Sequence, residues 1–231
     1  MIKNILLVST MRSGTHMAHR MIARHIGFNS NISYGISELD IDELNFNCNS
    51  DRFNLYVTHF ESIELWTKQK LHQLNAVIKN RDIYVLFLDR IDFNEQVLSR
   101  AIMATFAGPK NEWKADNKKI KGKVRLKKAV VEDEYRNLAR IKYHNNLDRI
   151  PLTVHQKIYY EDILENGLTV NGVDIPFVLD SNNLAVVKNP SKKDSIRNYD
   201  EVLKWMEQLS EKYNKEWQPY IVWGENNALY L

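Results

Sequence analysis

The chain has 231 residues, of which 44% are hydrophobic, and a formal net charge of +3 at pH 7. A chain of this length and composition can bury one substantial core, so we expect a single domain over residues 1–231. The mild charge does not indicate a nucleic-acid coat and no apolar run approaches the roughly 20 residues of a membrane helix, so we expect neither nucleic acid nor membrane as a partner.

The first half of the chain alternates apolar strand-like runs with helical spacing. The predicted elements are a strand over 4–9, a helix over 17–26 that ends at Gly27, a strand over 54–58, a helix between 61 and 80, a strand over 83–88 and a helix over 92–107 that ends at Gly108-Pro109. Residues 28–50 are polar and are expected to form a loop. The run at 83–88 is continuously apolar, as expected of a strand that is covered on both faces.

The second half begins with a change in composition. Residues 110–128 form a basic, Gly-containing stretch, which is either a solvated loop or a mobile lid over an anionic ligand. A helix over 130–147, a strand over 152–159 and a helix over 200–213 follow, and Asn171-Gly172 predicts a tight hairpin turn. The alternation predicts an α/β fold, with a parallel sheet of about five strands and helices on both faces.

The segment after the first strand has the composition of a phosphate cradle. Short hydroxyl side chains, one glycine and one guanidinium precede a helix in the order Ser9-Thr10-Met11-Arg12-Ser13-Gly14-Thr15-His16. Backbone N–H groups in such a turn point outward, where the positive end of the helix dipole favours an anion. A Ser or Thr cap on an ordinary strand-turn-helix unit is the alternative. The sequence thus predicts a phosphorylated ligand.

This segment lacks one phosphate motif and resembles another. A Walker A loop needs two glycines and a Lys before Ser or Thr, and the segment has a single glycine, Gly14, and no Lys, which disfavours ATP hydrolysis. Arg12-Ser13-Gly14-Thr15 resembles the 5′-phosphosulfate loop of sulfotransferases that use 3′-phosphoadenosine 5′-phosphosulfate (PAPS). His16 departs from the second hydroxyl residue of that family, although its ring nitrogen can donate a hydrogen bond. The resemblance implies a P-loop-like three-layer sandwich with a central parallel β-sheet, in which residues 12–16 contact PAPS.

A second motif follows the third predicted strand. Sulfotransferases bind the 3′-phosphate of PAPS with an Arg at the end of such a strand and a Ser on the next helix, and Arg90 and Ser99 resemble that pair. Arg90 lies nine residues before Ser99, whereas the family's usual spacing is eight. The pattern most similar to the bacterial trehalose sulfotransferase branch comprises Asp92, Gln96, Ser99, Arg100-Ala101, Gly108 and Trp113. Taken alone, Asp92 could instead be a helix N-cap and Ser99 an ordinary surface residue.

Two later stretches agree with this resemblance. Tyr159-Tyr160-Glu161-Asp162-Ile163-Leu164 resembles the Tyr-Glu-Asp-Leu stretch found late in many sulfotransferases, where we expect a structural role. Arg197-Asn198-Tyr199-Asp200-Glu201 is similar to their C-terminal Asn-Tyr-Glu-Glu helix start. The resemblance touches most of the chain but is specific mainly at residues 9–16 and 89–113.

Sulfuryl transfer requires a base for the acceptor hydroxyl and a cation for the leaving bridging oxygen, and it requires no metal. Arg12 fits the cation. His59, at the end of the second predicted strand, resembles the His of the Lys-Thr-His motif of cytosolic sulfotransferases and is one candidate base. Glu38 is the other, because Gly35-Ile36-Ser37-Glu38 loosely resembles the loop that supplies a Glu base in the trehalose branch. For His59 the alternative is a polar residue near the surface, and for Glu38 it is the start of a solvated helix in the acidic run over residues 38–43.

The predicted activity is a sulfotransferase that moves a sulfuryl group from PAPS to a hydroxyl acceptor. The resemblance favours a carbohydrate acceptor, and a protein tyrosine, a lipid or a small alcohol stays open. The alternatives are a P-loop-like nucleotide kinase and a non-catalytic protein that binds PAPS or phosphate. The single cysteine, Cys48, and a strand pattern that begins almost at Met1 lead us to expect a cytoplasmic protein without a signal peptide. The oligomeric state stays open.

Overall fold

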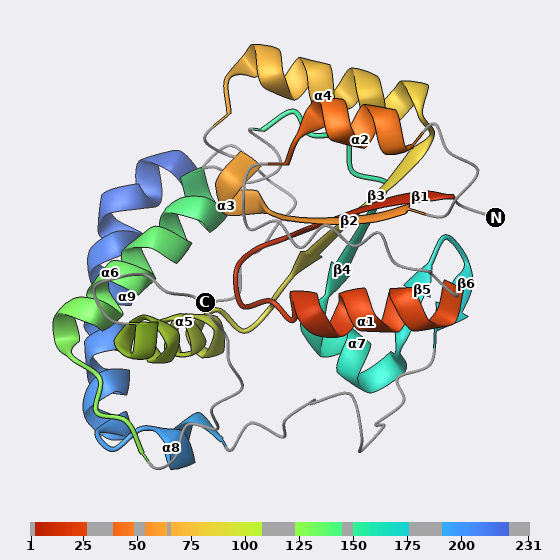
Figure 1. Cartoon of the computed structure of the whole chain (residues 1–231). Helices are drawn as coiled ribbons and strands as arrows, with labels where there is room; N and C mark the ends of the chain where they lie inside the picture. The colour runs from red at the N-terminus through yellow and green to blue at the C-terminus, as the bar shows by residue number, and fades with distance from the viewer. Residues whose placement is uncertain are drawn as a thin grey trace. The chain divides into compact units, whose positions relative to one another are not determined.

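The chain falls into two compact units in a computed structural model (Figure 1). The structure describes residues 3–26, 39–48, 54–63, 66–107, 123–144, 150–175 and 191–221. Met1–Ile91 and Ile150–Val187 form the sheet unit, and Asp92–Arg149 and Lys188–Leu231 form the helical unit. The single domain over residues 1–231 stays a prediction.

A parallel sheet forms the centre of the sheet unit. Its strands are β1 (Asn4–Ser9), β2 (Asn54–His59), β3 (Ile83–Asp89) and β4 (Gln156–Tyr159), in the order β2-β1-β3-β4. The structure therefore confirms the expected parallel sheet and describes four strands in it, one fewer than the five or so predicted. Ser9 pairs with His59 on one side and with Leu88 on the other, so the carboxyl ends of these strands meet along one edge.

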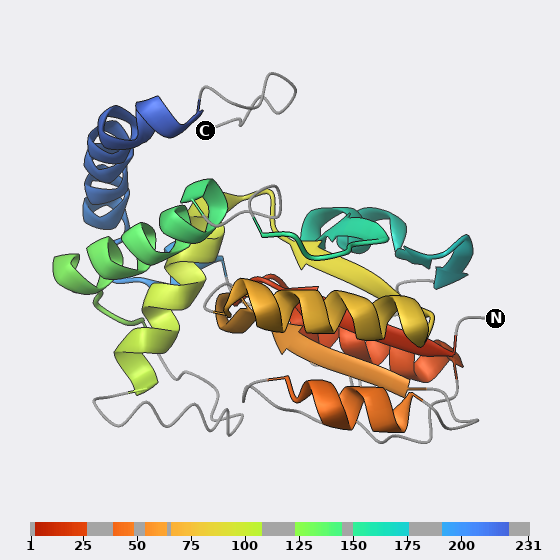
Figure 2. The same cartoon turned by 90° about the horizontal axis from the view of Figure 1, so that it is seen from above.

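Helices cover both faces of this sheet, as expected for a continuously apolar central strand (Figures 1 and 2). One face carries α1 (Thr15–Ile26), α7 (Tyr160–Asn166) and the small hairpin of β5 (Leu168–Val170) and β6 (Val173–Ile175). The other face carries α2 (Ile41–Asn47) and α4 (Lys68–Asn80). Alternate residues of β1 supply the two cores, with Ile5 and Leu7 packed toward α1. The sheet unit is thus an α/β arrangement compatible with a three-layer sandwich.

Two predictions in this unit were wrong in part. The loop expected over 28–50 contains the short helix α2, whose Leu44 is fully buried and whose start is capped by Asp40, because Asp40 Oδ1 accepts from the amide of Asp42 at 2.9 Å. The helix expected between 61 and 80 is two helices, α3 (Phe60–Ile63) and α4. Thr67 caps α4 by accepting from the amide of Lys70 at 3.2 Å, and this cap starts the second helix afresh.

The hairpin turn predicted at Asn171-Gly172 is confirmed. These two residues join β5 to β6 and both adopt positive φ, at 47° and 77°. Two left-handed residues in succession are the requirement of the tight turn that matches the twist of a hairpin, and Asn followed by Gly is the pair that adopts it most readily. The chemistry of two residues therefore determines this turn.

The helical unit is built from α5 (Phe93–Ala107), α6 (Lys128–Ala139), α8 (Lys192–Ser195) and α9 (Tyr199–Ile221). The helix predicted over 130–147 corresponds to α6, which continues as a π-helical segment over Arg140–His144. α5, α6 and α9 share one apolar core, in which the rings of Tyr135 and Tyr213 stack at 5.8 Å. Asn198, just before α9, bonds both the amide and the carbonyl of Leu126 at 3.1 Å.

Much of the basic stretch 110–128, expected to be a loop or lid, lies outside the described residues, as do Gly108 and Trp113. In the part that is described, Val124 forms a single parallel bridge with Ile196 within the helical unit. Within the described ranges, none of the helices combines the length and the apolar character needed to cross a membrane.

Candidate functional site

The loop that leaves β1 adopts the backbone of an anion cradle. The amide of Ser13 donates to the carbonyl of Thr10 at 3.2 Å, which closes a turn directly after the strand. Arg12 and Gly14 both have positive φ, at 67° and 89°, on either side of Ser13. Alternation between left-handed and other conformations turns successive N–H groups toward the same side, and such a concave run of N–H groups binds anions. This backbone geometry is compatible with the predicted cradle, and the anion stays a prediction.

Two amides of this loop are available to a ligand. The amides of Met17 and Ala18 both donate to the carbonyl of Gly14, at 2.9 and 3.1 Å, so α1 begins at the loop. Among the described residues, no acceptor faces the amides of Gly14 and Thr15. Both lie at the positive end of the twelve-residue helix α1. The amides of Gly14 and Thr15 thus lie where α1 begins, and their contact with a ligand stays a prediction.

Side chains from two neighbouring strand ends hold the loop in place. The amide of Met11 donates to Glu61 Oε1 at 2.8 Å, and the hydroxyl of Thr10 donates to Asp89 Oδ1 at 2.9 Å. The buried hydroxyl of Ser13 donates to the carbonyl oxygen of Thr10 at 2.6 Å and lies 3.3 Å from the carbonyl oxygen of Leu88. Ser13 therefore fixes the turn, and the loop keeps its shape through bonds to β3 and to α3. Glu61 was not among the residues predicted from the sequence, and its signal there is a carboxylate two residues after a strand end.

His59 reaches the cradle through two hydroxyl groups. Its Nδ1 lies 3.3 Å from Ser9 Oγ, and Ser9 Oγ lies 2.7 Å from Thr15 Oγ1. Ser9 is fully buried and Thr15 nearly so, which orders this chain of contacts. When Nδ1 carries the proton and donates to Ser9, Ser9 can donate to Thr15, and Nε2 keeps a lone pair that can accept a proton. The candidate base is thus joined to the predicted phosphate loop.

Basic groups gather around the loop. Burial lowers the pKa of Arg12, and the charge of Arg90 lowers it further. Burial also lowers the pKa of His16, followed by the charges of Arg20, Arg12 and His59. Cations brought together in this way repel one another, and an anion bound among them would relieve that repulsion. The edge of the sheet therefore carries cations that can attract an anion, beside the carboxylates of Glu61 and Asp89 that hold the loop.

The remaining predicted site residues belong to the helical unit or lie outside the described residues. Ser99 belongs to α5 of the helical unit, where it is buried, so its part in a phosphate site stays a prediction from the sequence. Arg100 on the same helix forms an ion pair with Glu134 at 2.8 Å. Asp92 caps α5 by accepting from the amide of Glu95 at 2.8 Å, which is the alternative that the sequence left open. Glu38 lies outside the described residues.

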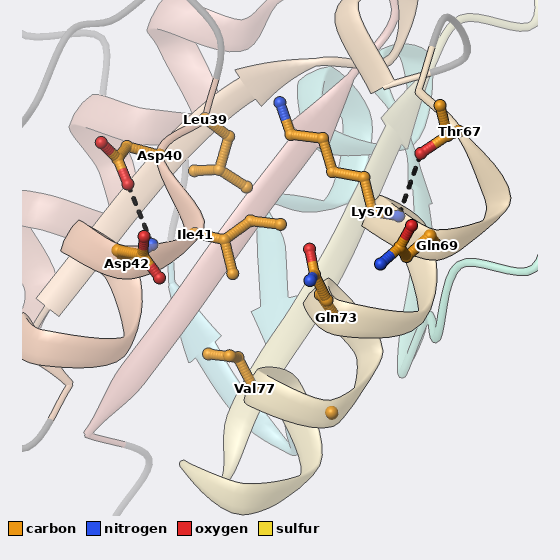
Figure 3. Close-up of a pocket in the computed structure, with 10 residues that line it drawn as sticks. Leu39, Asp40, Ile41, Asp42, Thr67, Gln69, Lys70, Gln73 and Val77 are labelled. Atoms are coloured by element: carbon orange, nitrogen blue, oxygen red, sulfur yellow. Dashed lines mark hydrogen bonds between the residues drawn. The ribbon is translucent and has the colours of Figure 1, made fainter.

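A separate open groove lies between α2 and α4, with a volume of about 770 Å³ (Figure 3). It is lined by Leu39, Asp40, Ile41, Asp42, Thr67, Gln69, Lys70, Gln73, Ala76 and Val77. Asp40 and Asp42 come from one wall and Lys70 from the other, with Lys70 Nζ 4.0 Å from the centroid of the Trp66 ring. Its walls carry charges of both signs, so electrostatics selects no class of ligand for this groove.

Comparison of the chain with protein-family models, with curated proteins and with solved structures gave no match. The resemblance to sulfotransferases therefore rests on the motifs at residues 9–16 and 89–113. The function has to be argued from the geometry of the site.

Proposed function

We propose that the protein is a P-loop-like PAPS-dependent sulfotransferase that acts on a hydroxyl acceptor. The observation that carries this proposal is the cradle of Arg12, Ser13, Gly14 and Thr15 between β1 and α1. In the strand order β2-β1-β3-β4 the chain adds β2 on one side of β1 and then adds β3 and β4 on the other side. Open α/β sheets bind ligands outside the carboxyl ends of the strands at such a switch point, which here lies between β1 and β3. The amides of Gly14 and Thr15 would hold the 5′-phosphosulfate.

The residues around the cradle match the needs of sulfuryl transfer. The acceptor oxygen forms a bond to sulfur, the bond from sulfur to the bridging oxygen breaks, and its electron pair stays on the departing phosphate. Arg12 would stabilise the negative charge that grows on the bridging oxygen. His59 would take the acceptor proton at Nε2, with Nδ1–H donating to Ser9. PAPS supplies the sulfuryl group, and Ser99 keeps its predicted role at the 3′-phosphate.

A nucleotide kinase is the second candidate, and Asp89 is the observation that favours it. Asp89 ends the strand beside β1 and bonds the loop through Thr10, and a carboxylate at this edge can hold a magnesium ion that carries nucleotide phosphates. The loop, however, has no Lys and only one Gly. A kinase would therefore need another cation in place of the Lys that a Walker A loop supplies to the nucleotide phosphates.

The test is a thermal-shift screen of nucleotides with and without Mg²⁺. A sulfotransferase should be stabilised more by adenosine 3′,5′-bisphosphate than by ADP, ATP or AMP in the absence of metal, because only the bisphosphate carries the 3′-phosphate. Equal shifts for the bisphosphate and ADP, or a strict need for Mg²⁺, would overturn the proposal in favour of the kinase. Sulfuryl transfer from PAPS to a panel of sugars, phenols and alcohols then identifies the acceptor class.

A further inference from the structure

Tyr160 and Glu161 are the first two residues of α7, and the ring of Tyr160 meets the phosphate loop, residues 10–15, at Gly14. A Cβ atom added to Gly14 would lie 2.8 Å from Cε2 of the Tyr160 ring, so the ring packs directly on the loop backbone. The guanidinium carbon of Arg90 lies 4.9 Å from the centroid of the same ring. Cations are attracted to the faces of aromatic rings. The ring therefore links Arg90 to the loop.

Glu161 ties down both the side chain and the backbone at the end of β3. Its Oε1 accepts from Nε of Arg90 at 3.2 Å, and its Oε2 accepts from the amide of Ile91 at 2.9 Å. The side chains of Arg90 and Glu161 are only 15% and 29% exposed. A carboxylate that bonds two groups in one short turn leaves the guanidinium little freedom to swing into water.

Burial lowers the pKa of Arg12, and the charge of Arg90 lowers it further, so the two guanidinium charges oppose each other. Two guanidinium groups stay together only where other groups fix them or an anion lies between them. The Tyr160 ring and the Glu161 carboxylate are the groups that fix Arg90. Both cations thus converge on the loop that follows β1.

We infer that Tyr160 and Glu161 are positioning residues that hold Arg90 at the phosphate loop, so that Arg90 acts with Arg12 on the 5′-phosphate group of the nucleotide. The motif resemblance instead pairs Arg90 with Ser99 at the 3′-phosphate. The extra residue between Arg90 and Ser99 is consistent with this change of role. The inference rests on the proposed nucleotide site and assigns one of its charges.

The test compares three nucleotides by titration calorimetry: AMP, adenosine 3′-monophosphate and adenosine 3′,5′-bisphosphate. Arg90→Ala should weaken AMP and the bisphosphate by about tenfold and leave adenosine 3′-monophosphate unchanged, because one charge-assisted contact to the 5′-phosphate is lost. Loss confined to the two nucleotides that carry a 3′-phosphate would overturn the inference. Arg90→Gln, which removes the charge but keeps a side-chain N–H donor, replaces Arg90→Ala if that variant does not fold.

The role of Glu161 is tested through its dependence on Arg90. Glu161→Gln should weaken AMP binding several-fold in the parent and have no further effect in the Arg90→Ala background, because it acts through that side chain. Asp162→Asn is the matched control, since it removes one exposed negative charge from the same helical turn and should leave affinity unchanged. Additive losses, or an equal loss in the control, would overturn the positioning role.

Tyr160 gives an independent check by conservative replacement. Tyr160→Phe keeps the ring and should bind AMP like the parent, whereas Tyr160→Leu should lose affinity. Equal affinities for these two variants would count against the ring. If the parent protein binds adenosine 3′,5′-bisphosphate no more tightly than AMP, the proposed function is refuted. The AMP affinities of the Arg90 variants would still test the role of Arg90. A parent that binds none of the three would overturn both.

Discussion

Gly14→Ala probes the packing on which the geometry of the phosphate loop depends. Gly14 has φ +89°, a left-handed conformation that costs an L-residue about 1–2 kcal/mol. The added Cβ would also approach Cε2 of Tyr160 to 2.8 Å, and forcing a ring out of a packed position costs about 1–3 kcal/mol. The substitution should therefore lower the free energy of unfolding by roughly 2–5 kcal/mol.

Gly172→Ala is the matched control in the same unit. Gly172 has φ +77°, and among the described residues no atom lies within 4 Å of where its Cβ would be. Gly172→Ala should therefore lower the free energy of unfolding only by the cost of the left-handed backbone, about 1–2 kcal/mol. Urea denaturation followed by circular dichroism measures both values. A loss for Gly14→Ala no greater than for Gly172→Ala would refute the claim that the Tyr160 ring packs on the loop.

A double variant separates the two contributions. If the ring is the obstacle, Gly14→Ala should cost less in a Tyr160→Ala background than in the parent, because the space that the ring occupied is then open. AMP affinity should fall in Gly14→Ala and stay unchanged in Gly172→Ala. Unaltered AMP binding by a folded Gly14→Ala protein would count against the cradle itself.

The remaining predictions concern pH, the base and the cation. Burial, with the charges of His16 and Arg20, lowers the pKa of His19 to about 4, so the unfolded state binds more protons than the folded state below pH ~6.5. The free energy of unfolding should then fall by up to about 3 kcal/mol as the pH drops from about 6.5 to 4. In urea titrations, His19→Asn should make the free energy of unfolding depend less on pH, and an unchanged dependence would contradict this account. If His59 is the base, His59→Ala should slow sulfuryl transfer by roughly 10² to 10⁴-fold with little change in bisphosphate affinity, whereas loss of turnover only in Glu38→Gln would move the base to Glu38. Arg12→Ala should reduce both turnover and affinity, and a change in turnover alone would show that Arg12 does not contact the ground state.

Local sequence determined the elements and the composition of the candidate site. The spacing of apolar residues and the chemistry of turns act over a few residues. The sequence therefore predicted the strands, the Asn171-Gly172 hairpin and the helix after the first strand. The run of hydroxyl residues and Gly14 after a buried strand likewise specified a cradle without knowledge of its neighbours. The sequence offered a solvated helix start over residues 38–43 but did not predict that Leu44 of α2 is buried, because that burial depends on packing that seven residues alone do not encode.

Tertiary structure decided which side chains meet at the cradle. Glu61 reaches the amide of Met11 across 50 residues, and Glu161 reaches Arg90 across 71, because parallel pairing aligns the carboxyl ends of β2, β1, β3 and β4. Parallel strands are joined by crossover connections that do not set the register of side chains at the sheet edge. The sequence alone therefore predicted the loop, whereas only the folded sheet showed what holds that loop and where Arg90 lies.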